Sequence, residues 1–221
     1  NISRPNVTLI GEDPEKTVLT YDVASGCTIK EEHGGDGTAT YGTSKSASVS
    51  ISSKAVNFKA VNVTFENSFD EEANKDMKNK QAVALKNEAD RSLFVNCRFL
   101  GDQDTLLANK NTTQYYSNCY IEGDVDFIFG SATAIFDECE LFSSERNGIT
   151  PSGYITAPNT EKGRKGYLVI NSILTSDVKE RGSVYLGRPW HPSSATTEID
   201  SSVAFVNTKM GYHIAKEGWT E

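Results

Sequence analysis

Two acidic segments of this chain repeat at a fixed offset. The segments GDQDTL and GDVDFIFG contain Asp104 and Asp126, which lie 22 residues apart, and Gln81 and Gln103 are separated by the same 22 residues. This period is too long for a helical turn and too short for a domain, but it suits one coil of a solenoid, where equal offsets stack side chains. We therefore expect Asp104 to neighbour Asp126 and Gln81 to neighbour Gln103.

Short segments rich in β-branched and aromatic residues recur along the chain between Gly, Asn, Asp and Ser, as is typical of β-strands. One series is centred on positions 63, 97, 119, 139 and 172, and a second covers 49–51, 82–85, 105–107, 127–129, 154–156 and 184–186. Within 61–65, apolar residues alternate with polar ones, which predicts a strand with one inward and one outward face. Two series that advance together predict an all-β chain folded as a parallel β-helix.

Polar insertions and small residues complete this prediction. Four insertions are expected to form surface loops, with a turn of helix within 71–80: 31–46, 66–80, 143–153 and 158–165. An asparagine recurs beside the strand centres and predicts turns or amide stacks: Asn62, Asn96, Asn118 and Asn171. Three cysteines recur at offsets of 22 and 20 residues and are expected to stack in the core rather than form disulfides: Cys97, Cys119 and Cys139.

Composition limits the classes of partner. The 221 residues suffice for one sizeable core, so we expect a single domain over 1–221. A net charge of −8 and a pI near 5.0 argue against nucleic acid, because no basic face is available to neutralise phosphates. No apolar run approaches the roughly 18 residues of a membrane span. A densely charged polyanion is also disfavoured, but not one whose carboxylates are masked as esters.

The stacked acids suggest chemistry. Adjacent parallel strands lie about 4.7–4.9 Å apart, so one carboxyl group of the pair Asp104 and Asp126 should keep a proton while the other ionises. That division supplies an acid and a base or nucleophile, and the amides of Gln81 and Gln103 are suited to stabilise an oxyanion. A structural aspartate ladder is the alternative reading. Gln103 and Asp104 serve one groove only if the chain bends there.

A third motif, LGRPW, places Arg188 and Trp190 on the same side of an extended segment. The guanidinium suits a two-point contact with a carboxylate, and the indole suits stacking on a sugar ring. A surface salt bridge and a core tryptophan remain the alternative. No serine-esterase elbow, phosphate-binding loop or dinucleotide fingerprint occurs. The three histidines show no metal-ligand spacing and are expected in loops or at the surface: His33, His191 and His213.

Five segments in this order resemble the signature blocks of the pectin methylesterase family: QAVAL, GDQDTL, GDVDFIFG, YITAP and LGRPW. The similarity extends over essentially the whole chain and looks nearer to bacterial members than to plant ones. It implies a right-handed parallel β-helix, a single-stranded solenoid of three parallel sheets. The opening G-x-Y-x-E block and terminal strands usual in the family are missing, so we expect a helix truncated at both ends.

The resemblance also implies roles for particular residues. Asp126 matches the nucleophile and Asp104 the general acid and base, while Arg188 matches the arginine that orients the nucleophile. Gln81 and Gln103 match the glutamines that stabilise the oxyanion. Four further residues match substrate-binding positions: Trp190, Phe129, Met210 and Thr43.

The implied reaction is hydrolysis of the C6 methyl esters of homogalacturonan (pectin) to pectate and methanol, through an acyl-enzyme and without a metal or other cofactor. The resemblance further implies a secreted monomer that binds methyl-esterified pectin and neither nucleic acid nor membrane. Two alternatives stay open: a β-helical pectate lyase or galacturonan hydrolase, and a non-catalytic solenoid that binds pectin.

Overall fold

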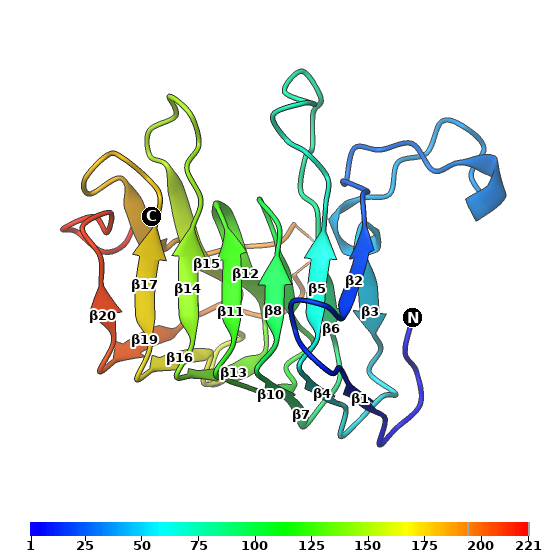
Figure 1. The fold of residues 1–221 in the computed structure, drawn as a ribbon, viewed down its shortest axis with the longest axis horizontal. Coiled ribbons are helices and arrows are strands. Elements are labelled where there is room, and N and C mark those ends of the chain that lie inside the picture. Colours follow the sequence, from blue (N-terminus) through cyan, green and yellow to red (C-terminus); the bar gives the residue numbers. More distant parts are fainter. Residues whose placement is uncertain (194, 221) are drawn as a thin grey trace.

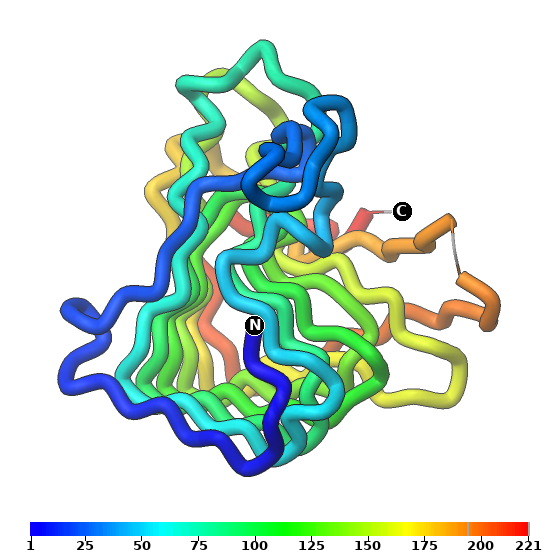
Figure 2. The backbone as a smooth tube through the Cα atoms, turned by 90° about the vertical axis from the view of Figure 1, so that its right-hand side faces the viewer, coloured from blue at the N-terminus to red at the C-terminus, as the bar shows by residue number. Residues whose placement is uncertain are grey.

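The computed structural model describes residues 1–193 and 195–220, which form three parallel sheets wound into a β-helix (Figures 1 and 2). Sheet A has the order β18-β15-β12-β9-β6-β3, with bounds Val184–Gly187, Gly153–Pro158, Val125–Gly130, Leu106–Ala108, Leu85–Asn87 and Val49–Ile51. Sheet B runs β1-β4-β7-β10-β13-β16-β19, with bounds Thr8–Ile10, Lys59–Val61, Ser92–Val95, Thr113–Ser117, Thr133–Asp137, Tyr167–Ile170 and Val203–Val206. Sheet C runs β2-β5-β8-β11-β14-β17-β20, with bounds Val18–Tyr21, Thr64–Asn67, Arg98–Leu100, Tyr120–Gly123, Glu140–Ser143, Ile173–Ser176 and Lys209–Met210. The prediction of an all-β parallel β-helix is therefore confirmed.

The 22-residue period is the register of neighbouring coils. Ile128 of β12 pairs with Leu106 of β9, at an offset of 22 residues. Leu106 pairs with Leu85 of β6, an offset of 21, because the backbone N–H groups of Ala84 and Leu85 both donate to the Thr105 carbonyl. The pairing therefore shifts by one residue between β9 and β6, and the strands of sheet A remain stacked.

Asparagines make the corner between sheets B and C. Their backbones are left-handed, a conformation that asparagine tolerates better than most residues; the φ angles are 57° at Asn62, 51° at Asn96, 52° at Asn118, 51° at Asn171 and 47° at Asn207. The Asn96 Nδ2 donates to the Asn62 Oδ1 at 2.8 Å, so both the turns and the amide stack are confirmed.

The expected strand over 61–65 is wrong. β4 ends at Val61 and β5 begins at Thr64, because the left-handed Asn62 turns the chain between two sheets. In the sequence, apolar and polar residues keep alternating through Asn62, so the pattern alone does not reveal the corner.

Aromatic rings and thiols fill the interior. The rings of Phe94, Tyr116 and Phe136 stack on consecutive coils of sheet B, with centroids 4.8 and 4.7 Å apart. All four cysteines are free thiols, and the three that recur are buried, as predicted: Cys97, Cys119 and Cys139.

The four expected insertions lie outside the regular sheets for most of their length, and those following β5 and β14 project beyond the strands (Figure 1). The turn of helix expected within 71–80 is wrong, because that segment forms only turns, whereas short 3₁₀ helices occur at Glu31–His33 and Thr43–Lys45. His213 lies in a turn, as expected of a loop residue, but it is not at the surface. It is only 1% exposed, and burial lowers the pKa of its imidazole. None of the helices in the described residues has the length and apolarity to span a bilayer.

Candidate active site

One cavity on the outer side of sheet A gathers the predicted site residues. Its volume is about 440 Å³, and it is lined by Thr43, Ser44, Gln81, Gln103, Asp104, Leu107, Asn109, Asp126, Phe129, Ala157, Arg188 and Trp190. Eight of the nine residues singled out from the sequence are in this lining. They come from five coils, those of β3, β6, β9, β12 and β18, which is possible only because the coils are stacked in register.

Met210 is the exception. It lies on β20 at the edge of sheet C, is 46% exposed and does not line this cavity. The expected placement of Met210 beside the other residues is therefore wrong for this cavity. The family resemblance matched Met210 by its position in the sequence, which does not predict that Met210 lies on sheet C instead of sheet A.

Left-handed backbone bends bring both aspartates into the cavity. The φ angles are 69° at Asp104 and 53° at Asp126, and aspartate is among the few residues that tolerate this conformation. At Asp104 the bend puts consecutive residues on one side, so Gln103 and Asp104 both line the cavity. This is the bend that the sequence-based reading required.

The expected neighbours are joined through the backbone. The N–H of Asp104 donates to the carbonyl of Val125 at 3.0 Å, which sets Asp104 beside Asp126 in a parallel ladder. The N–H of Ala82 donates to the carbonyl of Gln103 at 3.0 Å and likewise sets Gln81 beside Gln103. The buried Oε1 of Gln81 has no hydrogen-bond partner in the described part of the chain.

The carboxylate of Asp126 is held by Arg188 at two points. Nε of Arg188 donates to Oδ1 at 2.9 Å, and Nη2 donates to Oδ2 at 2.7 Å. This geometry rules out the lone surface salt bridge as a description of Arg188, because Asp126 has only 14% of its side chain exposed. Burial raises the pKa of Asp126, and the hydrogen bonds and charge of Arg188 act against that rise.

Asp104 has the opposite surroundings. It is 8% exposed, and no side chain forms an ion pair with it in the described residues. Burial and then the charge of Asp126 raise the pKa of Asp104 well above its ordinary value. The two carboxyl groups are therefore unequal: Asp126 ionises first, and Asp104 retains its proton. Such a pair presents an anion and an acid to one ligand.

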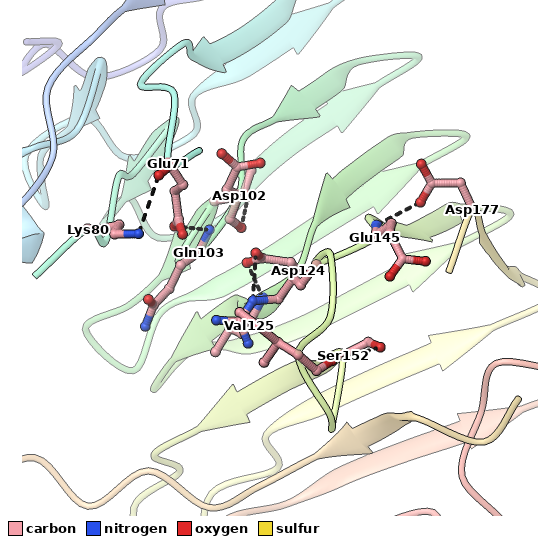
Figure 3. A network of polar contacts seen from close by, with 12 residues as sticks. Glu71, Lys80, Asp102, Gln103, Asp124, Val125, Glu145, Ser152 and Asp177 are labelled. Carbon is pink, nitrogen blue, oxygen red and sulfur yellow. Dashed lines mark hydrogen bonds and ion pairs between the residues drawn. The ribbon is translucent and has the colours of Figure 1, made fainter. Parts of the chain in front are cut away.

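A second cluster of acidic residues lies next to Gln103 of the cavity lining (Figure 3). Asp102 and Asp124 precede the site aspartates by two residues on the same coils, and burial raises the pKa of each to about 6. Arg146 forms an ion pair with Asp124 at 3.2 Å. Glu71, from the loop after β5, accepts a long hydrogen bond from the N–H of Gln103 at 3.4 Å (Figure 3).

Contacts within a coil and between neighbouring coils support the bends. The carboxylate of Asp124 accepts a hydrogen bond from the N–H of Val125 at 2.5 Å, next to the bend at Asp126. The hydroxyl of Thr105 donates to the carbonyl of Glu122 at 2.8 Å. Gly123 is required by close packing, because a Cβ there would lie 2.6 Å from the Asp102 carbonyl oxygen.

Two aromatic rings form one wall of the cavity. The rings of Phe129 and Trp190 have centroids 5.6 Å apart and planes inclined at 59°. Trp190 is 37% exposed, so the core-tryptophan alternative is wrong. An exposed indole beside polar groups is suited to cover the apolar face of a sugar ring.

Sequence reasoning missed Asp102, Asp124, Arg146 and Tyr154 as neighbours of the site. Asp102 and Asp124 had a signal, since they repeat the 22-residue offset of the site aspartates. Arg146 lies in an irregular loop, and Tyr154 approaches the site through Arg188, so neither has a local pattern that marks it.

Comparison with known proteins agrees with this geometry. The family model described as Pectinesterase matches residues 1–221. Pectinesterase 31 of Arabidopsis thaliana is 37% identical over 216 residues, covering 96% of this chain, and the chain spans 60% of that relative's length.

Among solved structures, the pectin methylesterase from Yersinia enterocolitica has a TM-score of 0.89 at 37% identity, covering 99% of this chain and 72% of that one. Pectin methylesterase PemA from Erwinia chrysanthemi has a TM-score of 0.86 at 34% identity, covering 96% of this chain and 66% of that one. The structure from carrot has a TM-score of 0.76 at 25% identity, with 100% and 65% coverage, so the bacterial structures superpose better. The chain belongs to the pectinesterase family.

Proposed function

We propose that this chain hydrolyses the C6 methyl esters of homogalacturonan, releasing methanol and leaving pectate. The observation that carries the proposal is the unequal aspartate pair: Asp126 held at two points by Arg188, beside the buried Asp104 in one cavity. An aspartyl esterase needs an ionised nucleophile and a protonated acid on neighbouring positions. These two environments supply them without a metal or other cofactor.

In the first half-reaction, an oxygen of the Asp126 carboxylate attacks the ester carbonyl carbon of C6. Negative charge develops on the carbonyl oxygen, where the side-chain amides of Gln81 and Gln103 donate hydrogen bonds. When the tetrahedral intermediate collapses, the bond to the methoxy oxygen breaks and Asp104 delivers its proton to that oxygen. Methanol leaves, and an anhydride joins the substrate to Asp126.

In the second half-reaction, the ionised Asp104 acts as a base. It removes a proton from water as the water oxygen attacks the anhydride, and the bond to Asp126 breaks. The products are a galacturonic acid carboxyl group, which ionises by releasing its proton to the solvent, the regenerated Asp126 carboxylate and a protonated Asp104. Arg188 keeps the Asp126 carboxylate oriented through both halves.

The substrate class is supported by the composition and by the relatives. Two solved pectin methylesterase structures, with TM-scores of 0.86, are described as complexes with hexasaccharides. A chain of net charge −8 accepts a polymer better when its carboxylates are methyl-esterified, because charge repulsion is then removed. The same proposal takes residues 1–221 as one domain that acts outside the cell, as a monomer, on the pectin of cell walls.

The test is a methanol-release assay on highly methylated pectin, with the parent protein and Asp126→Asn. We expect methanol from the parent, no shortening of the polymer and no effect of a chelator. Asp126→Asn should release less than about a hundredth of the parent's methanol.

The alternatives predict other outcomes. A pectate lyase depends on Ca²⁺ and yields unsaturated ends, and a galacturonan hydrolase yields new reducing ends. A pectin-binding solenoid without catalysis releases no methanol from either protein. Any of these results overturns the proposal.

A further inference from the structure

Arg188 reaches Asp126 across an intervening coil. Arg188 follows β18 and Asp126 lies on β12, and β15 is the strand between them in sheet A. The side chain of Arg188 is 38% exposed, so its own coil does not enclose it. A long, partly solvated side chain has many rotamers, so a further contact is needed to hold the guanidinium over the middle coil.

The middle coil supplies an aromatic ring at that point. Cζ of Arg188 lies over the ring of Tyr154, 4.1 Å from its centroid. Tyr154 pairs with Val125, the residue before Asp126, and with Tyr185, three residues before Arg188, so it lies on the strand between the two partners of the ion pair. The face of an aromatic ring carries negative potential and attracts a guanidinium stacked on it.

The ring of Tyr154 is itself supported. It stacks on the ring of Tyr185 with centroids 5.7 Å apart and planes inclined at 16°. Because both tyrosines are paired residues of adjacent strands, the backbone ladder holds the two rings together. Tyr154 is not in the lining of the cavity, whereas Arg188 is.

We propose that Tyr154 is a positioning residue, whose ring is the platform that holds the Arg188 guanidinium in place to bind both oxygens of Asp126. The proposal rests on the proposed function, because it gives Tyr154 a part in the esterase reaction. Its effect passes entirely through Arg188, without contact between Tyr154 and the substrate. Without the ring, Arg188 spends less time on Asp126, and the Asp126 carboxylate is both less oriented and less easily ionised.

The kinetic test compares Tyr154→Leu with Tyr154→Phe, which keeps the ring face. We expect Tyr154→Leu to lower kcat by about tenfold with KM within about twofold, and Tyr154→Phe to stay within about twofold of the parent. In the pH profile of kcat/KM, the acid limb of Tyr154→Leu should move to higher pH, because Arg188 then stabilises the Asp126 anion less. A purely structural role of Tyr154 would leave that limb in place.

A matched control is available on another sheet. Arg98 lies over the ring of Tyr120 with Cζ 5.4 Å from the centroid, and neither residue lines the candidate active site. Tyr120→Leu removes a stacked pair of the same kind, so kcat and the pH profile should not change. An effect equal to that of Tyr154→Leu would overturn the proposal.

Other outcomes also count against it. A higher KM with unchanged kcat for Tyr154→Leu would make Tyr154 a substrate contact, and equal losses for the Leu and Phe variants would exclude the ring face as the cause. Tyr154→Met replaces Tyr154→Leu if the latter does not fold. A carbon-13 NMR titration of Asp126 separates this inference from the proposed function, since a higher Asp126 pKa in the ring-lacking variant is expected even if the parent releases no methanol. An unchanged Asp126 pKa overturns the inference.

Discussion

Arg188 and Asp126 lie 62 residues apart in the chain, yet two hydrogen bonds of 2.9 and 2.7 Å join the guanidinium to both carboxylate oxygens. The contact spans two steps of the coil and stabilises the ionised form of a buried acid. Asp104, on the next coil, lacks such a partner and keeps its proton. This difference in partners is what makes the two stacked aspartates unequal.

Removal of the guanidinium should therefore slow the reaction more than it weakens binding. We expect Arg188→Ala to lower kcat by about a hundredfold or more with KM within about threefold, and Arg188→Lys to fall between, because lysine keeps the charge but loses the two-point geometry. Steady-state methanol release measures both constants. A large rise in KM with kcat preserved would instead make Arg188 a ligand of the substrate.

Trp190 should affect binding in preference to rate. Trp190→Ala removes the exposed half of the aromatic wall, and we expect KM to rise about tenfold with kcat within about twofold. His191→Ala is the control, because His191 is exposed and does not line the cavity. Equal effects of the two substitutions would contradict a specific role of the indole.

The asparagine column should stabilise the coils. Asn96→Ala places a less tolerant residue at φ 51° and removes hydrogen bonds to Asn62 and Asn118, so we expect a loss of about 1–2 kcal/mol in the free energy of unfolding. Asn96→Gly should recover part of that loss, because glycine accepts the left-handed backbone. Urea denaturation measures both variants, and a glycine variant less stable than the alanine variant would refute the backbone part of the explanation.

Asp102 should reduce stability at neutral pH. Its pKa is raised to about 6 in the folded protein, chiefly by burial, so the folded state binds the proton more tightly than the unfolded chain does. At or below about pH 4, Asp102 does not lower the free energy of unfolding, because it can stay protonated. As the pH rises to about 6, the unfolded chain ionises more easily than the folded protein, so the destabilisation grows, and above that pH it stays constant. With an allowance for partial solvent screening, we expect Asp102→Asn to be about 1 kcal/mol more stable than the parent at pH 7 and equal to it at pH 4.

Thermal or urea unfolding at these two pH values tests the prediction. The control is Asp36→Asn, because hydrogen bonds from Thr38 and Ala39 lower the pKa of that exposed carboxyl to about 2, so its substitution should not stabilise the protein at pH 7. A gain for Asp36→Asn as large as that for Asp102→Asn would show that general charge reduction is responsible.

The parts of the fold that repeat were predictable from sequence, because coil stacking turns a period into a set of neighbours. Equal offsets of 22 residues placed Asp104 beside Asp126 and Gln81 beside Gln103 without any knowledge of the loops. The corner at Asn62 was harder to locate, since apolar alternation runs unbroken from one strand into the next.

Contacts made by residues outside the repeating strand pattern were not predictable. The platform under Arg188 depends on Tyr154 from a different coil, and the pairing of Asp124 with Arg146 depends on the path of a loop. The burial of His213 likewise comes from packing near the chain end, where no apolar pattern announces it. Tyr154 is 34 residues from Arg188, and Arg146, although 22 residues after Asp124, lies in a loop where the strand pattern is interrupted.

We infer that Asp126 attacks the ester carbonyl carbon, whereas Asp104 only transfers protons. A nitrophenyl ester of galacturonate tests it, because nitrophenolate leaves without being protonated, whereas methanol needs an acid. The measurement is the burst of nitrophenol released on mixing the ester with the parent, Asp104→Asn or Asp126→Asn. The comparison requires that the parent turns over this ester.

For Asp104→Asn we predict a burst of about one equivalent per protein followed by very slow release, because the acyl-enzyme forms but lacks the base that activates water. For Asp126→Asn we predict no burst. A burst from Asp126→Asn, or none from Asp104→Asn while the parent turns over the ester, would contradict the assignment of the two aspartates.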